Sequence, residues 1–585
     1  MRLQTLFTIL LLQLDCIAPS LGAEPKVNKV RRKKIQSPAP SPPPVHSADS
    51  IKTPAPSSPD PIKKKPNILL IFADDVGTED VPGYWDTNIV QMPNIKKLQS
   101  MGVTFIDAHS SPLCSPSRYS LLSGNYPHRG STVQSTWNFW DGQNQFEPNQ
   151  KSIAEVLKGA NYRTWMAGKW HLGLETPSGN FHGTHILSKT GANWTNSVRD
   201  GPNDIGFDES FYTSGGIQEG PYAFFRNGVL VTQPSNVIFW PEGEYEMERG
   251  LSAIPSGGEG DKDWDSTAYN MIIVNETKAF LDNHNATGGD DPFFAYVALG
   301  AVHKPHSPPD HYMDGTPVAG EYSSPHFDLL LEMDKVVGTL VADIEDRGLL
   351  DDTIIIFASD NGGLNVLDVP RVLRGHKGNI YEGGHRIPMT FRYDGHYPKG
   401  EIRTSHFVGL NDMFATLAEI AEAPVPERSA QDSVSFAKYI ESEENTGGLR
   451  EYLGVWSYGK IEKKQQLKAE SLRFKNLKLI QHYNPSRWTE LYDLDNDLGE
   501  TTSISNNEEY QTILRVMRDK LNRLGPCPRD DPEPFYLSSG FHKGRRTMCN
   551  WFENDTSRCS DHFEGEIHCN SICGRFQTHC EHNPF

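Results

Sequence analysis

The stretch that indicates the fold is NILLIFADD, residues 67–75. A continuous apolar run that ends in two acidic residues predicts a strand covered on both faces. Similar runs follow at 293–299 (FFAYVAL) and 353–358 (TIIIFA), and apolar residues recur at helical spacing over 94–101 and 327–347. Strands that alternate with helices predict an α/β fold with a large, mostly parallel mixed sheet sandwiched by helices.

The pattern changes near residue 425. Short strands are predicted at 471–480 and 490–494, and a helix at 508–524. These elements are typical of a small α+β subdomain. After the N-terminal region, the sequence predicts a large α/β catalytic domain at 66–424, an α+β C-terminal subdomain at 425–526 and a cysteine-rich tail at 527–585.

The N-terminal residues 1–22 have the features of a signal peptide, namely Arg2, an apolar run at 6–14 and small residues near Gly22. The apolar run is shorter than a membrane span, although a short membrane anchor is the alternative, and no later stretch approaches spanning length. Residues 23–65 are rich in Pro, Ser and Lys, which predicts a disordered linker.

Charge argues against nucleic acid as a partner. After residue 65 the chain carries 45 basic and 71 acidic residues, so any anionic substrate must meet a local positive field. Four N-glycosylation sequons, at Asn193, Asn275, Asn285 and Asn554, fit a secretory route. We expect a secreted or lysosomal protein, with the extracellular space preferred.

The chain has eight cysteines, of which Cys16 would leave with the signal peptide. Six lie between Cys527 and Cys580 and are predicted to form three disulfides, with a zinc knuckle involving nearby histidines as the alternative. Cys114 is left over. It is either a buried free thiol or a residue with a chemical role.

Cys114 precedes a predicted helix at 115–123 that Gly124 would end. A helix N-terminus favours an anion, whether a thiolate or a bound oxyanion, because its free N–H groups and dipole point there. A purely structural cysteine is the alternative at such a position.

Oxygen-bearing side chains follow two of the apolar strands. Asp74 and Asp75 come after the first, and Asp360 and Asn361 after the run at 353–358. The carboxyl ends of parallel strands meet at one edge of a sheet, so these four side chains are expected to converge. Oxygen ligands suit Ca²⁺ or Mg²⁺ better than zinc.

A lysine and a histidine stand two apart in GKWHLG, residues 168–173, after a predicted strand at 162–166. From an extended chain, Lys169 and His171 would point the same way. Lys169 would supply fixed positive charge and His171 a titratable proton carrier.

Several of these segments together resemble the formylglycine-dependent sulfatases of the alkaline phosphatase superfamily. CSPSR at 114–118, followed by Leu121-Leu122-Ser123-Gly124, is similar to the family signature, and GKWHLG is similar to its second signature. His303-Lys304-Pro305 resembles the family's His-x-Pro, so His303 is the first candidate there and His306 the second. The resemblance covers roughly residues 66–500.

The resemblance implies a site and a reaction. Cys114 would be oxidised to formylglycine by the formylglycine-generating enzyme during secretion, and the hydrated aldehyde would attack the sulfur of a sulfated glycan or aryl sulfate. The implied cation is Ca²⁺, with Mg²⁺ less expected. The implied metal ligands are Asp74, Asp75, Asp360, Asn361 and residue 114. Arg118 would contact the diol and the acidic cluster, and Lys169 and Lys377 would contact the sulfuryl oxygens. His303 would donate a proton to the leaving group, and His171 would act as the base.

Two other functions remain open from the sequence. A phosphodiesterase or phosphonate hydrolase could use the same diol. An inactive extracellular binding or matrix protein, with the tail as its interaction module, belongs to a different class.

Overall fold

The computed structural model describes residues 64–525, except 86–88, 132–143, 149, 176–195, 248–249, 288–290, 366–371, 428, 462–463 and 484–485. The predicted signal peptide, the linker up to residue 63 and the cysteine-rich tail lie outside the described residues, as do Asn193 and Asn554. Asn275 and Asn285 lie exposed on one helix, and their glycosylation stays a prediction.

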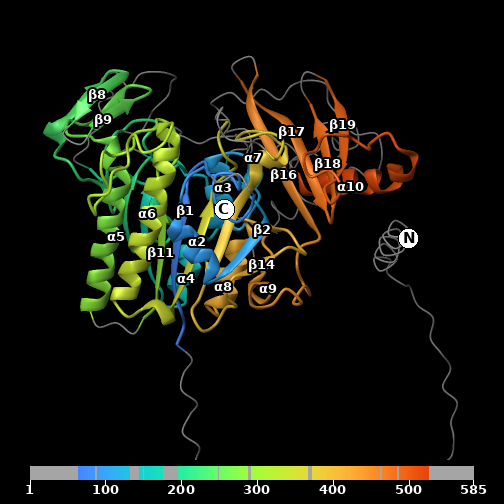
Figure 1. Ribbon diagram of the computed structural model, residues 1–585, viewed down its shortest axis with the longest axis horizontal. Coiled ribbons are helices and arrows are strands. Elements are labelled where there is room, and N and C mark those ends of the chain that lie inside the picture. The colour runs from blue at the N-terminus through green and yellow to red at the C-terminus, as the bar shows by residue number, and fades with distance from the viewer. Residues whose placement is uncertain are drawn as a thin grey trace, which may run out of the picture. The chain divides into compact units, whose positions relative to one another are not determined.

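The large sheet is mixed, as predicted, and helices lie along it (Figure 1). It has 11 strands. Its strands in spatial order are β14 (Glu401–Arg403), β2 (Val103–His109), β13 (Arg386–Arg392), β12 (Thr353–Ser359), β1 (Asn67–Ala73), β11 (Phe293–Ala298), β3 (Arg163–Lys169), β4 (Glu209–Thr213), β5 (Phe225–Arg226) and β6 (Val229–Leu230), with β15 (Val408–Gly409) beside β2. The neighbours β12, β1, β11, β3 and β4 are parallel to one another, whereas β13, β5 and β6 pair antiparallel with their neighbours. The three apolar runs are therefore confirmed as adjacent central strands.

Both faces of β1 are covered, which explains its continuous apolar sequence. Ile68, Leu70 and Phe72 pack into a core formed with α3 (Cys114–Ser123), α4 (Ile153–Gly159), α8 (Asp412–Ile420) and α9 (Ala437–Glu441). Leu69 and Ile71 pack into a second core formed with α2 (Pro93–Ser100), α5 (Tyr269–Ala286) and α6 (Pro325–Asp346). Successive side chains of a strand point to opposite faces, so each core receives every second residue. Burying each of these large aliphatic or aromatic side chains contributes about 1.5–3 kcal/mol.

The α-helices predicted at 94–101 and 327–347 are confirmed as α2 and α6, each with proline in its first turn. The helix after Cys114 is also confirmed, and Gly124 ends it with a φ of 67°. The α-helices are α2 (Pro93–Ser100), α3 (Cys114–Ser123), α4 (Ile153–Gly159), α5 (Tyr269–Ala286), α6 (Pro325–Asp346), α7 (Glu382–His385), α8 (Asp412–Ile420), α9 (Ala437–Glu441) and α10 (Gln511–Leu524). Within the described part of the chain, none is long and apolar enough to cross a membrane.

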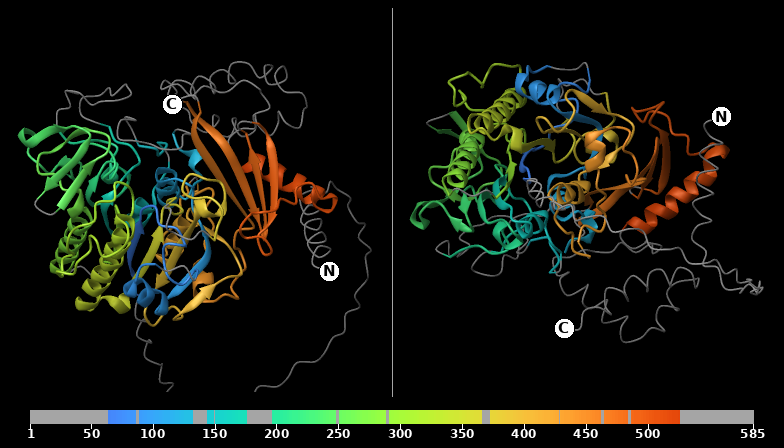
Figure 2. Two further views of the ribbon diagram at one scale, coloured as in Figure 1. Left: turned by 45° about the horizontal axis from the view of Figure 1, so that its top comes forward. Right: turned by 90° about the horizontal axis from the view of Figure 1, so that it is seen from below.

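A second, four-stranded antiparallel sheet follows toward the C-terminus, with α10 packed against β17 and β18 (Figures 1 and 2). Its strands are β16 (Tyr452–Ile461), β17 (Lys464–Phe474), β18 (Leu477–His482) and β19 (Trp488–Asp493). The single strand predicted at 471–480 was wrong, because the chain turns at Lys475, whose φ is 52°. The turn contains neither glycine nor proline, and its one turn-forming residue, Asn476, is a weaker local signal than either of those.

The residues just after 425 pack with the large sheet. Phe436, Tyr439 and Ile440 are buried in the same core as Phe105 of β2. The second sheet begins only at Tyr452. Two smaller sheets have two antiparallel strands each. One pairs β7 (Val237–Trp240) with β10 (Gly258–Asp261), and the other pairs β8 (Gly243–Met247) with β9 (Gly250–Ile254).

Candidate active site

The predicted site residues meet at the carboxyl ends of the parallel strands. Asp74 and Asp75 follow β1, Asp360 follows β12, His303 follows β11 and Lys169 ends β3. Cys114 begins α3, the helix that follows β2. This edge of a parallel sheet gathers ligand-binding side chains because all its strands end there.

Three carboxylates form the centre of the site, and all are fully buried: Asp74, Asp75 and Asp360. The backbone N–H of Asp75 donates to Asp360 Oδ1 at 3.1 Å, and Asn361 Nδ2 donates to Asp75 Oδ1 at 2.9 Å. Asp75 has a φ of 66°, which is uncommon for a residue other than glycine. The four residues of the predicted oxygen cluster are thus in one place.

Buried cations neutralise these carboxylates. Arg118 donates to Asp360 Oδ2 from Nε at 3.1 Å and from Nη2 at 2.8 Å, and Lys169 Nζ lies 2.6 Å from Asp74 Oδ2. Burial and Asp74 nevertheless raise the pKa of Asp360 to about 6, against the influence of Arg118. Charges this deep are tolerated only when they are paired.

Lys377 joins the acidic cluster to Cys114. Its Nζ lies 2.6 Å from Asp75 Oδ1 and 3.2 Å from Cys114 Sγ. Burial disfavours the charged form of both residues, but their mutual attraction outweighs it. Lys377 and His303 hold the pKa of Asp75 well below its usual range, and Asp75 raises the pKa of Lys377 above the usual range of a lysine. Lys377 therefore keeps its proton at physiological pH.

The residues present fit a divalent cation. Three buried oxygens have no hydrogen-bond partner: Asp74 Oδ1, Asp75 Oδ2 and Asn361 Oδ1. Asp74, Asp75, Cys114 and His303 each bring one potential ligand atom within 4.8 Å of the others. Buried oxygens without partners are costly, and a hard cation prefers such oxygens as ligands.

Cys114 is not set up to act as a thiolate. It is a free cysteine with 2% of its surface exposed, and its Sγ lies 3.7 Å from Asp75 Oδ1. Burial and the nearby Asp360 raise the pKa of the Cys114 thiol well above its usual range. The helix N-terminus alone therefore does not activate the sulfur.

Among the predicted histidines, His303 lies at the acidic cluster. Its Nε2 is 3.6 Å from Asp75 Oδ2, and its Nδ1 donates to the carbonyl of Lys304 at 2.5 Å. Burial and Lys377 lower the pKa of His303 to about 3, so the imidazole is neutral. The second candidate, His306, faces His326 instead, with ring centroids 5.2 Å apart.

Family comparison agrees with this geometry. The family model described as sulfatase matches residues 66–423, and the model described as N-sulphoglucosamine sulphohydrolase, C-terminal, matches residues 376–526. The chain belongs to the sulfatase family. It is a sulfuric ester hydrolase of the alkaline phosphatase superfamily, and membership implies a bound metal ion.

The sulfatase is similar to characterised relatives along most of its length. It is 29% identical over 518 residues to the N-acetylgalactosamine-6-O-sulfatase of Bacteroides thetaiotaomicron, covering 79% of this chain and 93% of the relative. It is 31% identical over 380 residues to human arylsulfatase A, covering 62% of this chain and 66% of the relative.

Solved structures share the fold. One Bacteroides thetaiotaomicron chain, from work on the metabolism of multiple glycosaminoglycans, has a TM-score of 0.65 at 24% identity and covers 78% of this sulfatase and 99% of its own length. The phosphonate monoester hydrolase of Agrobacterium radiobacter has a TM-score of 0.51 at 18% identity, with 79% and 95% covered. At these identities the likeness concerns the fold alone.

The position of His171 in the sulfatase corrects one step of the sequence argument. Lys169 ends β3, but His171 has a φ of 56°, so the chain between them is not extended. His171 is instead fixed by a bond to the chain that follows β4, in which its backbone N–H donates to the carbonyl of Ser214 at 2.7 Å. Burial, Lys169 and Arg118 lower the pKa of His171 well below its usual value, so this imidazole is also neutral.

One residue near the catalytic centre of the sulfatase escaped the sequence analysis. Glu219, which is 7% exposed, lies in the loop after β4, and its Oε1 is 3.9 Å from His171 Nε2. Gly215 makes room for it, because a Cβ at that position would lie 2.2 Å from Glu219 Oε1. The available signal was its place just after β4, a strand of only five residues (ESFYT) that was not predicted.

Proposed function

We propose that this sulfatase hydrolyses sulfate esters of carbohydrates, with a formylglycine made from Cys114 and a bound Ca²⁺. The observation that carries the proposal is the position of Cys114. Its Sγ lies 3.2 Å from Lys377 Nζ and 3.7 Å from Asp75 Oδ1, inside a buried cluster with unpartnered oxygens. A thiol with a raised pKa has little use there, whereas an oxygen nucleophile beside a cation fits the donor set.

The cluster around residue 114 offers ligands for a cation and room for the chemistry of a hydrated aldehyde. Asp74, Asp75, Asp360 and Asn361, with residue 114, would hold the cation. A hydrated aldehyde would supply one hydroxyl as nucleophile and a second from which a proton could be removed to release sulfate, and the cation would supply positive charge. A plain serine or cysteine lacks the second hydroxyl.

The charged side chains of the protein bind and orient the sulfate group. Lys169 and Lys377 present positive charge to the sulfuryl oxygens, where negative charge redistributes during the reaction. Lys169 is fully buried and the Lys377 side chain is 17% exposed, so little water screens their charges. Arg118 is fully buried against Asp360 and holds the acidic cluster in place beside residue 114.

Proton transfer falls to Lys377 and the two histidines. Lys377 holds its proton and can donate toward the leaving oxygen. His303 is neutral without substrate, and the negative charge of a bound sulfate ester raises its pKa toward a proton-donating range. His171, neutral and buried, is suited to accept a proton.

A sulfated carbohydrate is the proposed substrate class. The Bacteroides thetaiotaomicron relative is an N-acetylgalactosamine-6-O-sulfatase, and the match spans nearly its whole length. That coverage supports a 6-O-sulfated amino sugar as the first substrate to test. We also propose passage through the secretory pathway, which the N-terminal sequence supports and where the formylglycine-generating enzyme would be the partner.

Mass spectrometry of the peptide that contains residue 114 tests the proposal, with secreted protein assayed in parallel for sulfate release. An aldehyde at 114 together with release from 6-O-sulfated N-acetylgalactosamine is the expected result. Unmodified cysteine in active protein would contradict the formylglycine. Unmodified cysteine without any release would favour the inactive binding protein, and faster turnover of an aryl phosphate than of an aryl sulfate would favour the phosphodiesterase alternative.

A further inference from the structure

The lysine loop, residues 374–381, carries Lys377 and is attached to the core on one side. The backbone N–H of Lys377 donates to the carbonyl of Gly363 at 2.9 Å, and that of Gly378 donates to Pro112 at 2.7 Å. Gly363 follows the Asp360 segment, and Pro112 precedes Cys114. These bonds fix the backbone of the loop beside the metal ligands and residue 114.

The C-terminal subdomain holds the same loop from the other side. Ser457 on β16 donates through Oγ to the carbonyl of Gly378 at 2.7 Å. Arg374, at the start of the loop, donates through Nη1 to the carbonyl of Glu500 at 2.7 Å. The Oε2 of Glu500 accepts the backbone N–H of Glu382, just after the loop, at 2.6 Å. The beginning, the middle and the end of the loop are therefore all held by the subdomain.

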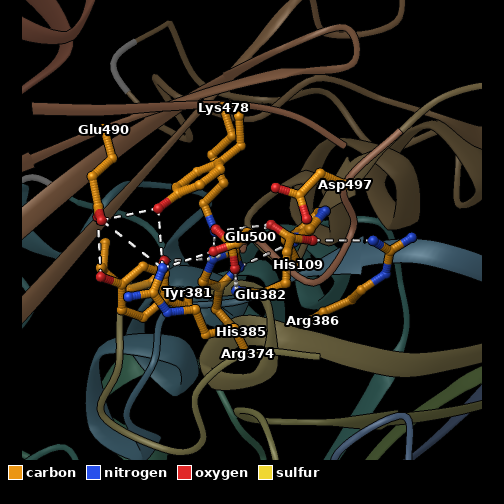
Figure 3. Close-up of polar contacts among 12 residues, drawn as sticks. His109, Arg374, Tyr381, Glu382, His385, Arg386, Lys478, Glu490, Asp497 and Glu500 are labelled. Carbon is orange, nitrogen blue, oxygen red and sulfur yellow. Dashed lines mark hydrogen bonds and ion pairs between the residues drawn. The ribbon is translucent and has the colours of Figure 1, made fainter. Parts of the chain in front are cut away.

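A buried ion network fixes Glu500 itself (Figure 3). Lys478 of β18 lies 2.8 Å from Glu500 Oε1 and 3.0 Å from Glu382 Oε1, and the three side chains are at most 2% exposed. Arg386 lies 3.0 Å from Glu382 Oε2. Burial would raise the pKa of Glu382, but Lys478 and its other neighbours hold it well below its usual range, so the carboxylate stays ionised.

The network is complete without a metal ion. His109, Glu382 and His385 bring three potential ligand atoms within 4.8 Å, but Lys478 Nζ lies 3.1 Å from His385 Nε2 and already supplies the cation. His385 Nδ1 contacts His109 Nδ1 at 3.1 Å, and His109 Nε2 contacts Asp107 at 2.8 Å. Because His109 Nε2 donates to Asp107, His109 Nδ1 accepts from His385 Nδ1 and His385 Nε2 accepts from Lys478, although the same His385 nitrogen also lies 3.1 Å from the carbonyl oxygen of Ile380.

We infer that Glu500 and Ser457 are positioning residues for hydrolysis: the C-terminal subdomain holds Lys377 in place through them. The inference rests on the proposed role of Lys377 at the sulfate group. Lys377 needs a fixed Nζ position to contact Asp75, residue 114 and a sulfuryl oxygen together, and a displacement of about 1 Å costs up to about 100-fold in rate. Within the loop the core bonds reach the backbone at 377–378, and Glu79 of the core holds the chain just before the loop, at 372–373.

The test compares two variants with a matched control in steady-state turnover of an aryl sulfate. Glu500→Gln keeps an oxygen for the Glu382 N–H but removes the charge that faces Lys478, and Ser457→Ala removes one hydrogen bond to Gly378. The control is Arg518→Met, because Arg518 on α10 bonds to Thr489 Oγ1 at 3.3 Å within the subdomain, away from the lysine loop and from the ion network. We expect kcat/KM to fall about 10-fold in the first two variants and less than about twofold in the control.

A double-mutant cycle separates positioning from stability. In a Lys377→Ala background, Glu500→Gln is expected to have little further effect on kcat/KM, because the residue through which it acts is gone. An undiminished effect in that background, or full activity of both single variants, would overturn the inference.

A crystal structure of Glu500→Gln supplies a readout that does not depend on activity. The expected result is a displaced Lys377 side chain, whereas a Lys377 Nζ still 2.6 Å from Asp75 Oδ1 would overturn the inference. Wild-type protein without turnover would contradict the proposed function and leave this structural readout to decide the role of the subdomain.

Discussion

The Nζ of Lys377 lies 2.6 Å from Asp75 Oδ1, although the two residues come from opposite ends of the catalytic domain sequence. Asp75 follows the central strand β1, and Lys377 sits on a loop between the large sheet and the C-terminal subdomain. The same lysine contacts Cys114 Sγ at 3.2 Å. One cation thus links the proposed metal ligands, the residue proposed to be modified and the second subdomain.

Cys114→Ala is expected to abolish turnover and preserve the fold. The proposed hydrated aldehyde at residue 114 supplies both hydroxyls and alanine supplies neither, so kcat should fall by at least about 1,000-fold. The measurement is turnover of an aryl sulfate together with the Tm of the purified variant. Turnover within about tenfold of the wild type would exclude residue 114 as the nucleophile.

His303→Ala is expected to affect substrates according to their leaving groups. Protonation matters most when the departing oxygen is a strong base, and general acid catalysis contributes about 100- to 10,000-fold. A sugar sulfate should therefore lose far more kcat than an activated aryl sulfate. Equal losses of kcat for both substrates would exclude His303 as the proton donor.

Removal of the cation is expected to lower thermal stability as well as activity. A ligand that binds only the folded state at 100 times its Kd stabilises it by about 2.7 kcal/mol, so Ca²⁺ added to chelator-treated protein should raise the Tm. Asn361→Ala removes an unpartnered oxygen and should diminish this Tm rise. Asn411→Ala, which changes a buried amide outside the site, is the control, and an equal Ca²⁺ response in both variants would contradict the assigned ligands.

The folded state is expected to lose stability as the pH falls below 6.5, partly through His385. Burial and Lys478 lower the pKa of His385 well below 6.5, so the unfolded chain binds a proton that the folded protein does not. This group alone contributes a loss of about 1.4 kcal/mol per pH unit below that value. Urea unfolding at pH 7.5, 6.5 and 5.5 measures the slope.

His385→Gln is expected to be less stable than the wild type at pH 7.5 but to show a shallower decline toward pH 5.5. The decline should not vanish, because burial also lowers the pKa values of His171 and His303. His311→Gln, on an exposed histidine, is the control and should keep the wild-type slope. A wild-type slope in His385→Gln would show that His385 is not the group responsible.

Local chemistry made much of the site predictable. The apolar run before Asp74 predicted a strand, the position of Gly124 predicted the end of α3, and the places of Asp75 and Asp360 directly after predicted parallel strands indicated that they share one edge of the sheet. These features depend on periodicity, capping and the geometry of parallel strands, all of which act over short stretches of sequence. The mixed parallel sheet followed from the same signals.

Tertiary structure alone decided which charges meet. The pairing of Lys377 with Asp75, the approach of Glu219 to His171 and the burial of Lys478 between two glutamates have no counterpart in sequence spacing. A buried charge is stable only beside a partner, and that partner is brought by packing between distant segments. By itself the sequence determined the strands, the helix at residue 114 and the chemical groups available, whereas long-range packing determined their neighbours and therefore their pKa values.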